Sequence, residues 1–94
     1  MMRVIWSHAA QDDVLDIADY YDRIAPNLAD EILQRLEDAS VPLIDFSQLG
    51  ELIDVEGDVR KRSVAGTPYI LLYVVASDRV EVQRVVHARS DWRP

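Results

Sequence analysis

The spacing of apolar residues in the first half of the chain predicts two amphipathic helices joined by a short connection. The side-chain oxygen of Ser7 can cap the start of the first helix. This helix should end near Ile24, just before Pro26. Pro26 can open the second helix, and Pro42 should end it. The apolar positions follow the period of one helix face, at Ala10, Val14, Ile17, Ala18 and Tyr21 and then at Leu28, Ile32, Leu33, Leu36 and Ala39.

The pattern at the start of the chain and in its second half is typical of β-strands. Residues 3–6 form a short β-type run, and residues 59–65 alternate weakly, as a half-exposed strand does. Residues 69–75 are continuously apolar and rich in β-formers, which predicts a central strand covered on both faces. Residues 43–58 are mixed and acidic, so we expect a loop there, with a short helical turn around residues 43–46.

The last predicted strand spans residues 80–89 and follows a hairpin turn at residues 77–78. Strand alternation places three of its valines on one face, Val80, Val82 and Val86. The predicted order is therefore β-α-α-β-β-β, an α+β fold with the helical hairpin packed on one face of a mainly antiparallel sheet. The other face is left partly open, and the place of the first strand in the sheet is not determined.

Composition limits the class of protein further. The 94 residues suit one domain, 1–94, about half of them are apolar, and the absence of cysteine excludes disulfides and thiolate metal sites. The longest apolar run, residues 69–76, is far shorter than the roughly 20 residues that span a bilayer. Residues 1–8 show no signal-peptide pattern, so we expect a cytoplasmic protein that does not enter membranes.

Charge is distributed unevenly along the chain. The net charge is −7, but residues 1–59 carry −11 and residues 60–94 carry +4. This asymmetry indicates a localised basic face in the last third of the chain. Solvated helix faces are the alternative explanation for the acidic half. The acidic ladder between Asp12 and Asp22 includes no histidine, so we expect no metal site and no cofactor.

Five segments in a fixed order cover almost the whole chain. They are the run Val4-Ile-Trp-Ser-His that continues to Tyr21, then Ala25-Pro-Asn-Leu-Ala29, Gly57-Asp-Val-Arg-Lys-Arg-Ser-Val64, Tyr69-Ile-Leu-Leu-Tyr73 and Val85-Val-His-Ala-Arg-Ser-Asp-Trp92. Each segment alone is unspecific, but their order and spacing together resemble the ParE/RelE toxin superfamily, and within it the ParE branch.

The resemblance implies the toxin of a type II toxin–antitoxin system, of the kind that stabilises plasmids. Such a toxin would inhibit DNA gyrase and form a hetero-oligomer with a ParD-like antitoxin, which alone would contact operator DNA. Two alternatives stay open. The chain could be a RelE-like ribosome-dependent mRNA endonuclease, or a non-toxic relative that only binds its antitoxin.

An RNA-cleaving toxin needs a general base, a general acid and cations that stabilise the phosphate charge. In ribonuclease relatives, the strand that corresponds to residues 69–73 carries a catalytic arginine where this chain has Ile70. Isoleucine cannot stabilise a phosphate, so this departure counts against the nuclease. If the chain is a nuclease, the candidate catalytic residues are Arg60, Arg62, Tyr73 and His87. Otherwise we expect no catalytic residue.

A binding mechanism directs attention to the arginines and the tryptophan near the end of the chain, because Trp and Arg are frequent at binding hot spots. The expected target-binding residues are Arg60, Arg62, Arg84, His87, Arg89, Trp92 and Arg93. Arg60 and Arg62 should share one face of their strand, whereas Lys61 should lie on the other. The plainer alternative is that the arginines pair across strands with Asp58, Glu81 or Asp91, and that His87 bonds to backbone. We further expect Val14, Ile17 and Leu36 in the core, and acidic antitoxin residues against the basic sheet.

Overall fold

The computed structural model describes residues 2–93, which form a helical hairpin and a five-stranded sheet. The helices are α1 (His8–Ile24) and α2 (Pro26–Ser40), followed by the short 3₁₀ helix η1 (Val41–Ile44). The strands are β1 (Arg3–Trp6), β2 (Glu51–Asp54), β3 (Val59–Ser63), β4 (Tyr69–Val75) and β5 (Arg79–His87). Within residues 2–93, no helix has both the length and the apolar character needed to cross a membrane.

The strands lie in the order β1-β5-β4-β3-β2. The last four pair antiparallel with their neighbours, and β1 pairs parallel with β5 at one edge. The α+β class is confirmed, because a helical hairpin and a mainly antiparallel sheet make up the fold. The central place of β4 is also confirmed, because it is the third of five strands and Tyr69 to Tyr73 are all buried. The sheet also places the first strand, which the sequence pattern left undetermined.

The prediction of a continuous loop over residues 43–58 is wrong, because this segment contains β2. The predicted order β-α-α-β-β-β therefore lacks one strand. Four residues, Glu51 to Asp54, are too few to show a clear alternation, and pairing with β3 is interrupted by a register shift between Leu52 and Asp54. The expected helical turn at residues 43–46 lies slightly earlier, at η1.

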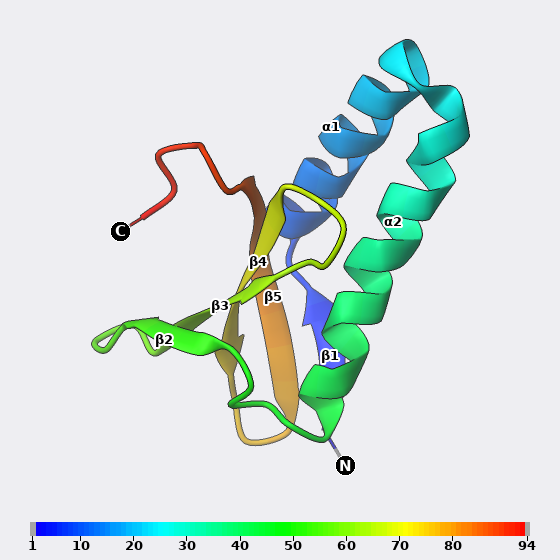
Figure 1. Ribbon diagram of the computed structural model, residues 1–94. Helices are drawn as coiled ribbons and strands as arrows, with labels where there is room; N and C mark the ends of the chain where they lie inside the picture. The colour runs from blue at the N-terminus through cyan, green and yellow to red at the C-terminus, as the bar shows by residue number, and fades with distance from the viewer. Residues whose placement is uncertain (1, 94) are drawn as a thin grey trace.

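The two helices pack against one face of the sheet, as predicted (Figure 1). Ser7 caps α1, since its Oγ accepts a hydrogen bond of 3.1 Å from the amide of Ala10. The core joins apolar residues of α1, α2 and η1 to those of the strands, among them Ile17, Leu36, Leu43, Leu71, Tyr73, Val80 and Val82. Leu28 was expected in the apolar stripe of α2 but is exposed, because the tip of the hairpin extends beyond the sheet (Figure 1).

A register shift in β5 changes which valines reach the core. Leu72 pairs with Arg84, whereas Tyr73 pairs with Val82, so Gln83 is left over as a bulge. Val85 consequently joins the buried cluster, and the expectation that Val86 shares a face with Val80 and Val82 is wrong. Alternation cannot predict this shift, because a single extra residue reverses the facing of everything that follows it.

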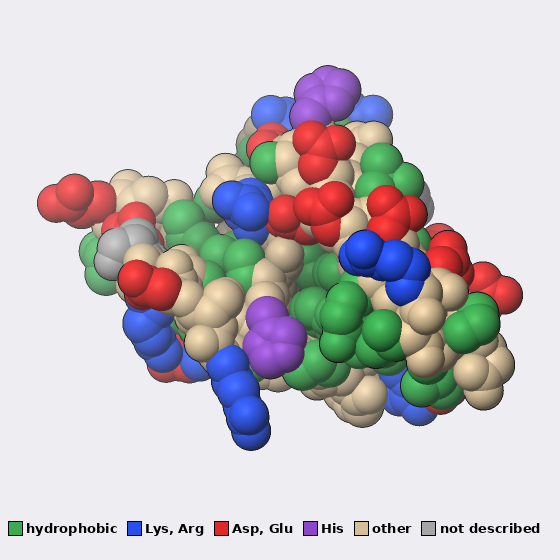
Figure 2. Space-filling model, turned by 90° about the horizontal axis from the view of Figure 1, so that it is seen from above, with side chains coloured by type: hydrophobic (Ala, Val, Ile, Leu, Met, Phe, Trp, Pro, Cys, Tyr) green, Lys and Arg blue, Asp and Glu red, His purple; other side chains and the backbone are tan. Residues whose placement is uncertain are grey.

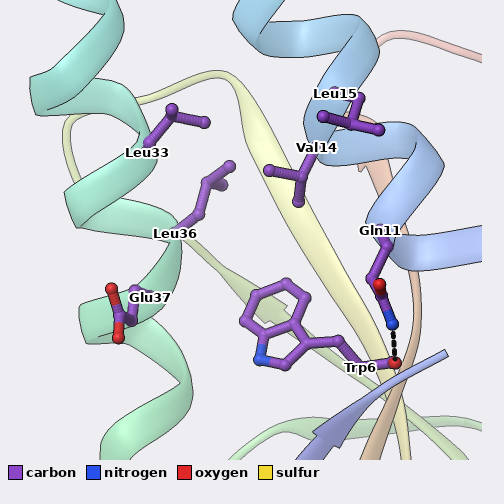
Figure 3. A pocket seen from close by; sticks show the side chains of 7 residues that line it. All are labelled: Trp6, Gln11, Val14, Leu15, Leu33, Leu36 and Glu37. Atoms are coloured by element: carbon purple, nitrogen blue, oxygen red, sulfur yellow. Dashed lines mark hydrogen bonds between the residues drawn. The ribbon is translucent and has the colours of Figure 1, made fainter. Parts of the chain in front are cut away.

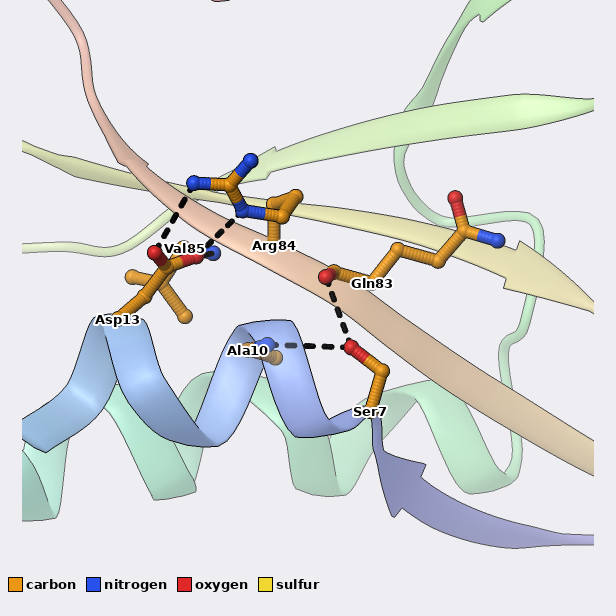
Figure 4. A network of polar contacts seen from close by, with 6 residues as sticks. All are labelled: Ser7, Ala10, Asp13, Gln83, Arg84 and Val85. Carbon is orange, nitrogen blue, oxygen red and sulfur yellow. Dashed lines mark hydrogen bonds and ion pairs between the residues drawn. The ribbon is translucent and has the colours of Figure 1, made fainter.

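Two residues at the start of α1, the N-cap Ser7 and Asp13 in the second turn, fix this bulge (Figure 4). The Ser7 hydroxyl donates to the carbonyl of Gln83 at 2.8 Å. The carboxylate of Asp13 accepts from the backbone amide of Val85 at 2.9 Å and from the guanidinium of Arg84 at 2.8 and 3.0 Å. These bonds join the start of the chain to β5, just before the C-terminal tail (residues 88–93) begins.

The sheet face away from the helices is also apolar in its centre. Ile70 and Leu72 are only 6% and 8% exposed, yet neither belongs to the core cluster that the helices cover. Lys61 lies opposite Leu72 on this face, and Val86 lies opposite Ile70. The C-terminal tail runs on the side of the sheet away from the helices (Figure 1).

Candidate interaction surfaces

Arg60 and Arg62 share one face of β3, as predicted, and it is the helix side of the sheet, because their cross-strand partners are Tyr73 and Leu71. Both guanidinium groups donate to backbone carbonyls. Arg60 reaches the carbonyl of Gly50 at 2.9 Å, and Arg62 reaches that of Ala39 at 2.8 Å. These bonds hold the end of α2 and the segment before β2 against the sheet. The cross-strand acid pairs considered for these two arginines do not form among the described residues.

Tyr73 is fully buried, and its hydroxyl has two backbone partners. It accepts from the amide of Gly50 at 2.8 Å and donates to the carbonyl of Ser47 at 2.9 Å. The phenol therefore closes the loop before β2 onto the core. In this arrangement its proton is held by a carbonyl, and solvent does not reach the ring.

His87 is exposed at the end of β5, where the tail begins. Its Nδ1 accepts from the amide of Arg89 at 3.1 Å, and its ring lies edge-on to that of Tyr69, with 5.8 Å between the centroids. The histidine thus bonds to backbone, as the plainer reading of the sequence expected. Arg84 lies three residues earlier on β5 and is exposed, but its guanidinium is bonded to Asp13. The hydrogen bond and the charge of the Asp13 carboxylate raise the pKa of the Arg84 guanidinium.

The tail presents most of the remaining candidates. Arg89 and Arg93 are exposed, and Trp92 is half-buried. The indole Nε1 of Trp92 donates to the carbonyl of Ala88 at 3.2 Å, and the guanidinium of Arg93 lies 4.7 Å from the indole ring. Trp92 is also 5.7 Å from the ammonium of Lys61, a residue that the sequence analysis did not include in the site. The predicted site residues therefore separate into two sets. One is a helix-side pair, Arg60 and Arg62, and the other is an exposed group around the tail: Arg84, His87, Arg89, Trp92 and Arg93.

A hollow lies elsewhere, between the two helices and β1. It is a groove of about 450 Å³, and its walls are largely apolar (Figure 3). Leu15 on α1 is 63% exposed beside it. Trp6, the last residue of β1, forms one end of the groove, and the side-chain amide of Gln11 donates to the Trp6 carbonyl at 2.8 Å. The groove is lined by Trp6, Gln11, Val14, Leu15, Leu33, Leu36 and Glu37. Of the expected core residues, Ile17 and Leu36 are buried, and Val14 is half-buried in this groove.

One acid, Glu37, lines the groove, and the two helices that form it carry further exposed acids. Figure 2, which looks down on the molecule, shows acidic side chains grouped together, with Lys and Arg side chains lying singly around them. The exposed acids of the two helices are Asp12, Asp16, Asp19, Asp22, Asp30, Glu31, Glu37 and Asp38. Among residues 2–93, no three His, Cys, Asp or Glu side chains gather in a way that could hold a metal ion.

The chain is similar to known proteins over almost its whole length. The family described as "ParE toxin of type II toxin-antitoxin system, parDE" matches residues 4–92. The protein named "Toxin RelE2" of Caulobacter vibrioides is 30% identical over 88 residues, which is 94% of this chain and 97% of that protein. A solved structure titled "Chromosomal ParDE TA system from P. aeruginosa" has a TM-score of 0.81 at 21% identity, and the match covers 93% of this chain and 96% of that one.

The family match spans the helical hairpin, the sheet and most of the tail. The chain belongs to the ParE toxin family of type II toxin–antitoxin systems. The resemblance that the sequence motifs carried is confirmed, and the solved ParDE structure confirms the fold class.

Proposed function

We propose that this toxin inhibits DNA gyrase by binding to it, with the exposed group around the tail as contact surface. The observation that carries the proposal is the exposure of Arg89 and Arg93, the second of which lies against Trp92, at the basic end of an otherwise acidic chain. An indole with a guanidinium against its ring combines apolar area with directed hydrogen bonding, and Trp and Arg are the residues most frequent at binding hot spots. His87 and Arg84 extend this surface along β5.

The mRNA endonuclease is the competing function, and the name RelE2 of the Caulobacter vibrioides relative is the reason to keep it in the test. The geometry supports it less well. A general acid must reach the substrate, but Tyr73 is buried and bonded on both sides. The cations that would stabilise a phosphate, Arg60 and Arg62, already donate to backbone carbonyls. Within this proposal, the two arginines act indirectly, by holding the scaffold from which the tail emerges.

The second part of the proposal concerns the antitoxin. The ParDE neighbour is a toxin–antitoxin system, and we propose a ParD-like antitoxin for this chain, with an apolar segment that fills the groove beside Leu15 and Trp6. Because Glu37 lies on the groove wall, basic antitoxin residues would flank that segment. The expected antitoxin acids would meet the basic sheet and tail instead. Gyrase and such an antitoxin are cytoplasmic partners, so the toxin would act in the cytoplasm.

The target is tested by inducing the full chain in bacteria beside a chain truncated after Ala88. We expect the full chain to cause filamentation and a DNA-damage response, and we expect the truncated chain, checked for folding by circular dichroism, to lose both. Translation arrest with cleaved message would support the endonuclease. A truncated chain as toxic as the full chain would remove the tail from the contact surface, and no phenotype for the full chain would indicate a non-toxic relative.

The antitoxin groove is tested by a matched pair of substitutions. Leu15→Lys places a charge beside the groove, whereas Val55→Lys places one at an apolar residue that is 82% exposed in the turn between β2 and β3. We expect calorimetry with the antitoxin encoded beside the toxin to give at least a tenfold weaker affinity for Leu15→Lys, about 1.4 kcal/mol. Val55→Lys should bind as the parent does. Equal affinities for both variants would place the antitoxin away from the groove.

A further inference from the structure

Lys61 lies in the middle of β3, on the sheet face away from the helices, and it is the only lysine in the sequence. Its ammonium lies 3.3 Å from the carboxylate of Glu51 on the neighbouring strand β2. The side chain is only 24% exposed, although its strand is next to the edge of the sheet and one face of that strand points away from the core. Something besides β2 therefore covers it.

The C-terminal tail is the segment that reaches Lys61. The base of the tail is tied to the start of β4, because the amide of Ala88 donates to the carbonyl of Pro68 at 2.8 Å. From there the tail turns back, and the ring centre of Trp92 lies 5.7 Å from the Lys61 ammonium. This distance falls within the roughly 6 Å at which a cation is attracted to the face of an indole.

A continuous series of ionic and cation–π contacts thus connects Glu51, Lys61, Trp92 and Arg93. Glu51 limits where the Lys61 ammonium can lie, the ammonium meets the indole, and the indole carries the Arg93 guanidinium at 4.7 Å. A six-residue tail loses conformational entropy when it is held in one place, so a contact made before target binding reduces the cost of ordering it at that moment.

We propose that Lys61, oriented by Glu51, is a positioning residue that keeps the tail folded over the sheet and presents Trp92 and Arg93 to the target in one arrangement. The contact surface is then a composite of the tail and the outer face of β3, not a free arm. The role in target binding rests on the proposed function, whereas the docking of the tail does not depend on it.

The docking is tested on the purified protein by fluorescence. The sequence has two tryptophans, so Trp6→Phe leaves Trp92 as the only indole. In that background we compare acrylamide quenching of Trp92 fluorescence in the parent and in the variants Lys61→Met, Lys61→Arg and Glu51→Gln. Met keeps most of the aliphatic stem without the charge, and Arg keeps the cation. From the strength of exposed cation–π contacts, Lys61→Met should lower the ratio of docked to free tail about two- to fivefold and increase quenching. Lys61→Arg should restore the parent value, and Glu51→Gln should fall between them.

A second readout uses the single lysine directly. Reductive methylation with ¹³C labels Lys61 and the terminal amine, and the indole ring current should shift the Lys61 methyl resonance. That shift should disappear in Trp92→Leu. Quenching and chemical shift that are the same in Lys61→Met or Trp92→Leu as in the parent would overturn the docking.

Growth inhibition tests the consequence of docking. Lys61→Met should weaken growth inhibition, so that about two to five times as much inducer is needed to stop growth. Lys61→Arg should restore the inducer concentration that the parent needs. Greater quenching with unchanged inhibition would overturn the positioning role. If the full chain proves not to act on gyrase while quenching responds to Lys61 as expected, the proposed function fails and the docked tail stands.

Discussion

The hydroxyl of Tyr73 is the most direct point at which to separate a structural from a catalytic role. Tyr73→Phe removes one oxygen and keeps the ring. In the protein that oxygen accepts from the amide of Gly50 at 2.8 Å and donates to the carbonyl of Ser47 at 2.9 Å. The substitution therefore leaves one backbone donor and one backbone acceptor without their partner.

The expected loss of stability follows from the burial of these two groups. Gly50 is buried, and an unsatisfied buried donor costs about 1–3 kcal/mol. Ser47 is only half-buried, so water can replace the phenol at its carbonyl and that loss should be small. We expect a decrease of about 2 kcal/mol in the free energy of unfolding. For a domain of this size, that corresponds to a melting temperature lower by roughly 8–16 °C.

Urea denaturation followed by circular dichroism measures this change, and Tyr20→Phe is the matched control. Tyr20 is exposed on α1, so its hydroxyl should contribute less than about 0.5 kcal/mol. Below its unfolding transition, Tyr73→Phe should still inhibit growth. Unchanged stability, or lost toxicity in a variant that remains fully folded, would refute the reasoning and return Tyr73 to the list of catalytic candidates.

Two further predictions concern the bulge in β5 and the buried phenol of Tyr69. Asp13→Ala removes the acceptor of the Val85 amide and the partner of Arg84, and it should cost about 1–3 kcal/mol in urea denaturation, whereas exposed Asp12→Ala should cost under about 0.5. Burial, with the neighbouring phenol of Tyr21, raises the pKa of Tyr69 to about 12. Since an unfolded tyrosine ionises near pH 10, this contribution to stability is complete below about pH 10 and is lost as the pH rises toward 12. Stability should therefore fall between about pH 10 and 11.5, less steeply in Tyr69→Phe, and equal slopes in the two proteins would contradict the assignment.

The helices and the central strand could be predicted from the sequence because each carries a strong periodic signal. The caps and prolines bounded α1 and α2 almost to the residue. What could not be predicted depends on tertiary pairing. β2 forms because β3 offers it an edge, and the facing of Val86 depends on a bulge that Ser7 and Asp13 hold from the far end of the chain.

The sequence predicted which residues make up the candidate site better than it predicted where they lie on the sheet. The basic C-terminal third and the shared face of Arg60 and Arg62 follow from residue order, but which side of the sheet the helices would cover does not. That choice turned the two arginines toward backbone carbonyls and left Lys61 on the outer face. A lone lysine between two arginines gives no signal of its importance until the tail is seen beside it.

The central claim is that this ParE-family chain acts by binding and breaks no covalent bond. The measurement that tests it most directly incubates the purified chain with gyrase and supercoiled DNA, and in parallel with translating ribosomes and message. We predict that gyrase–DNA complexes accumulate with the DNA cleaved by gyrase, that the chain truncated after Ala88 has no such effect, and that the message stays intact. Message cut at defined sites, with cutting lost in His87→Ala, would contradict the account.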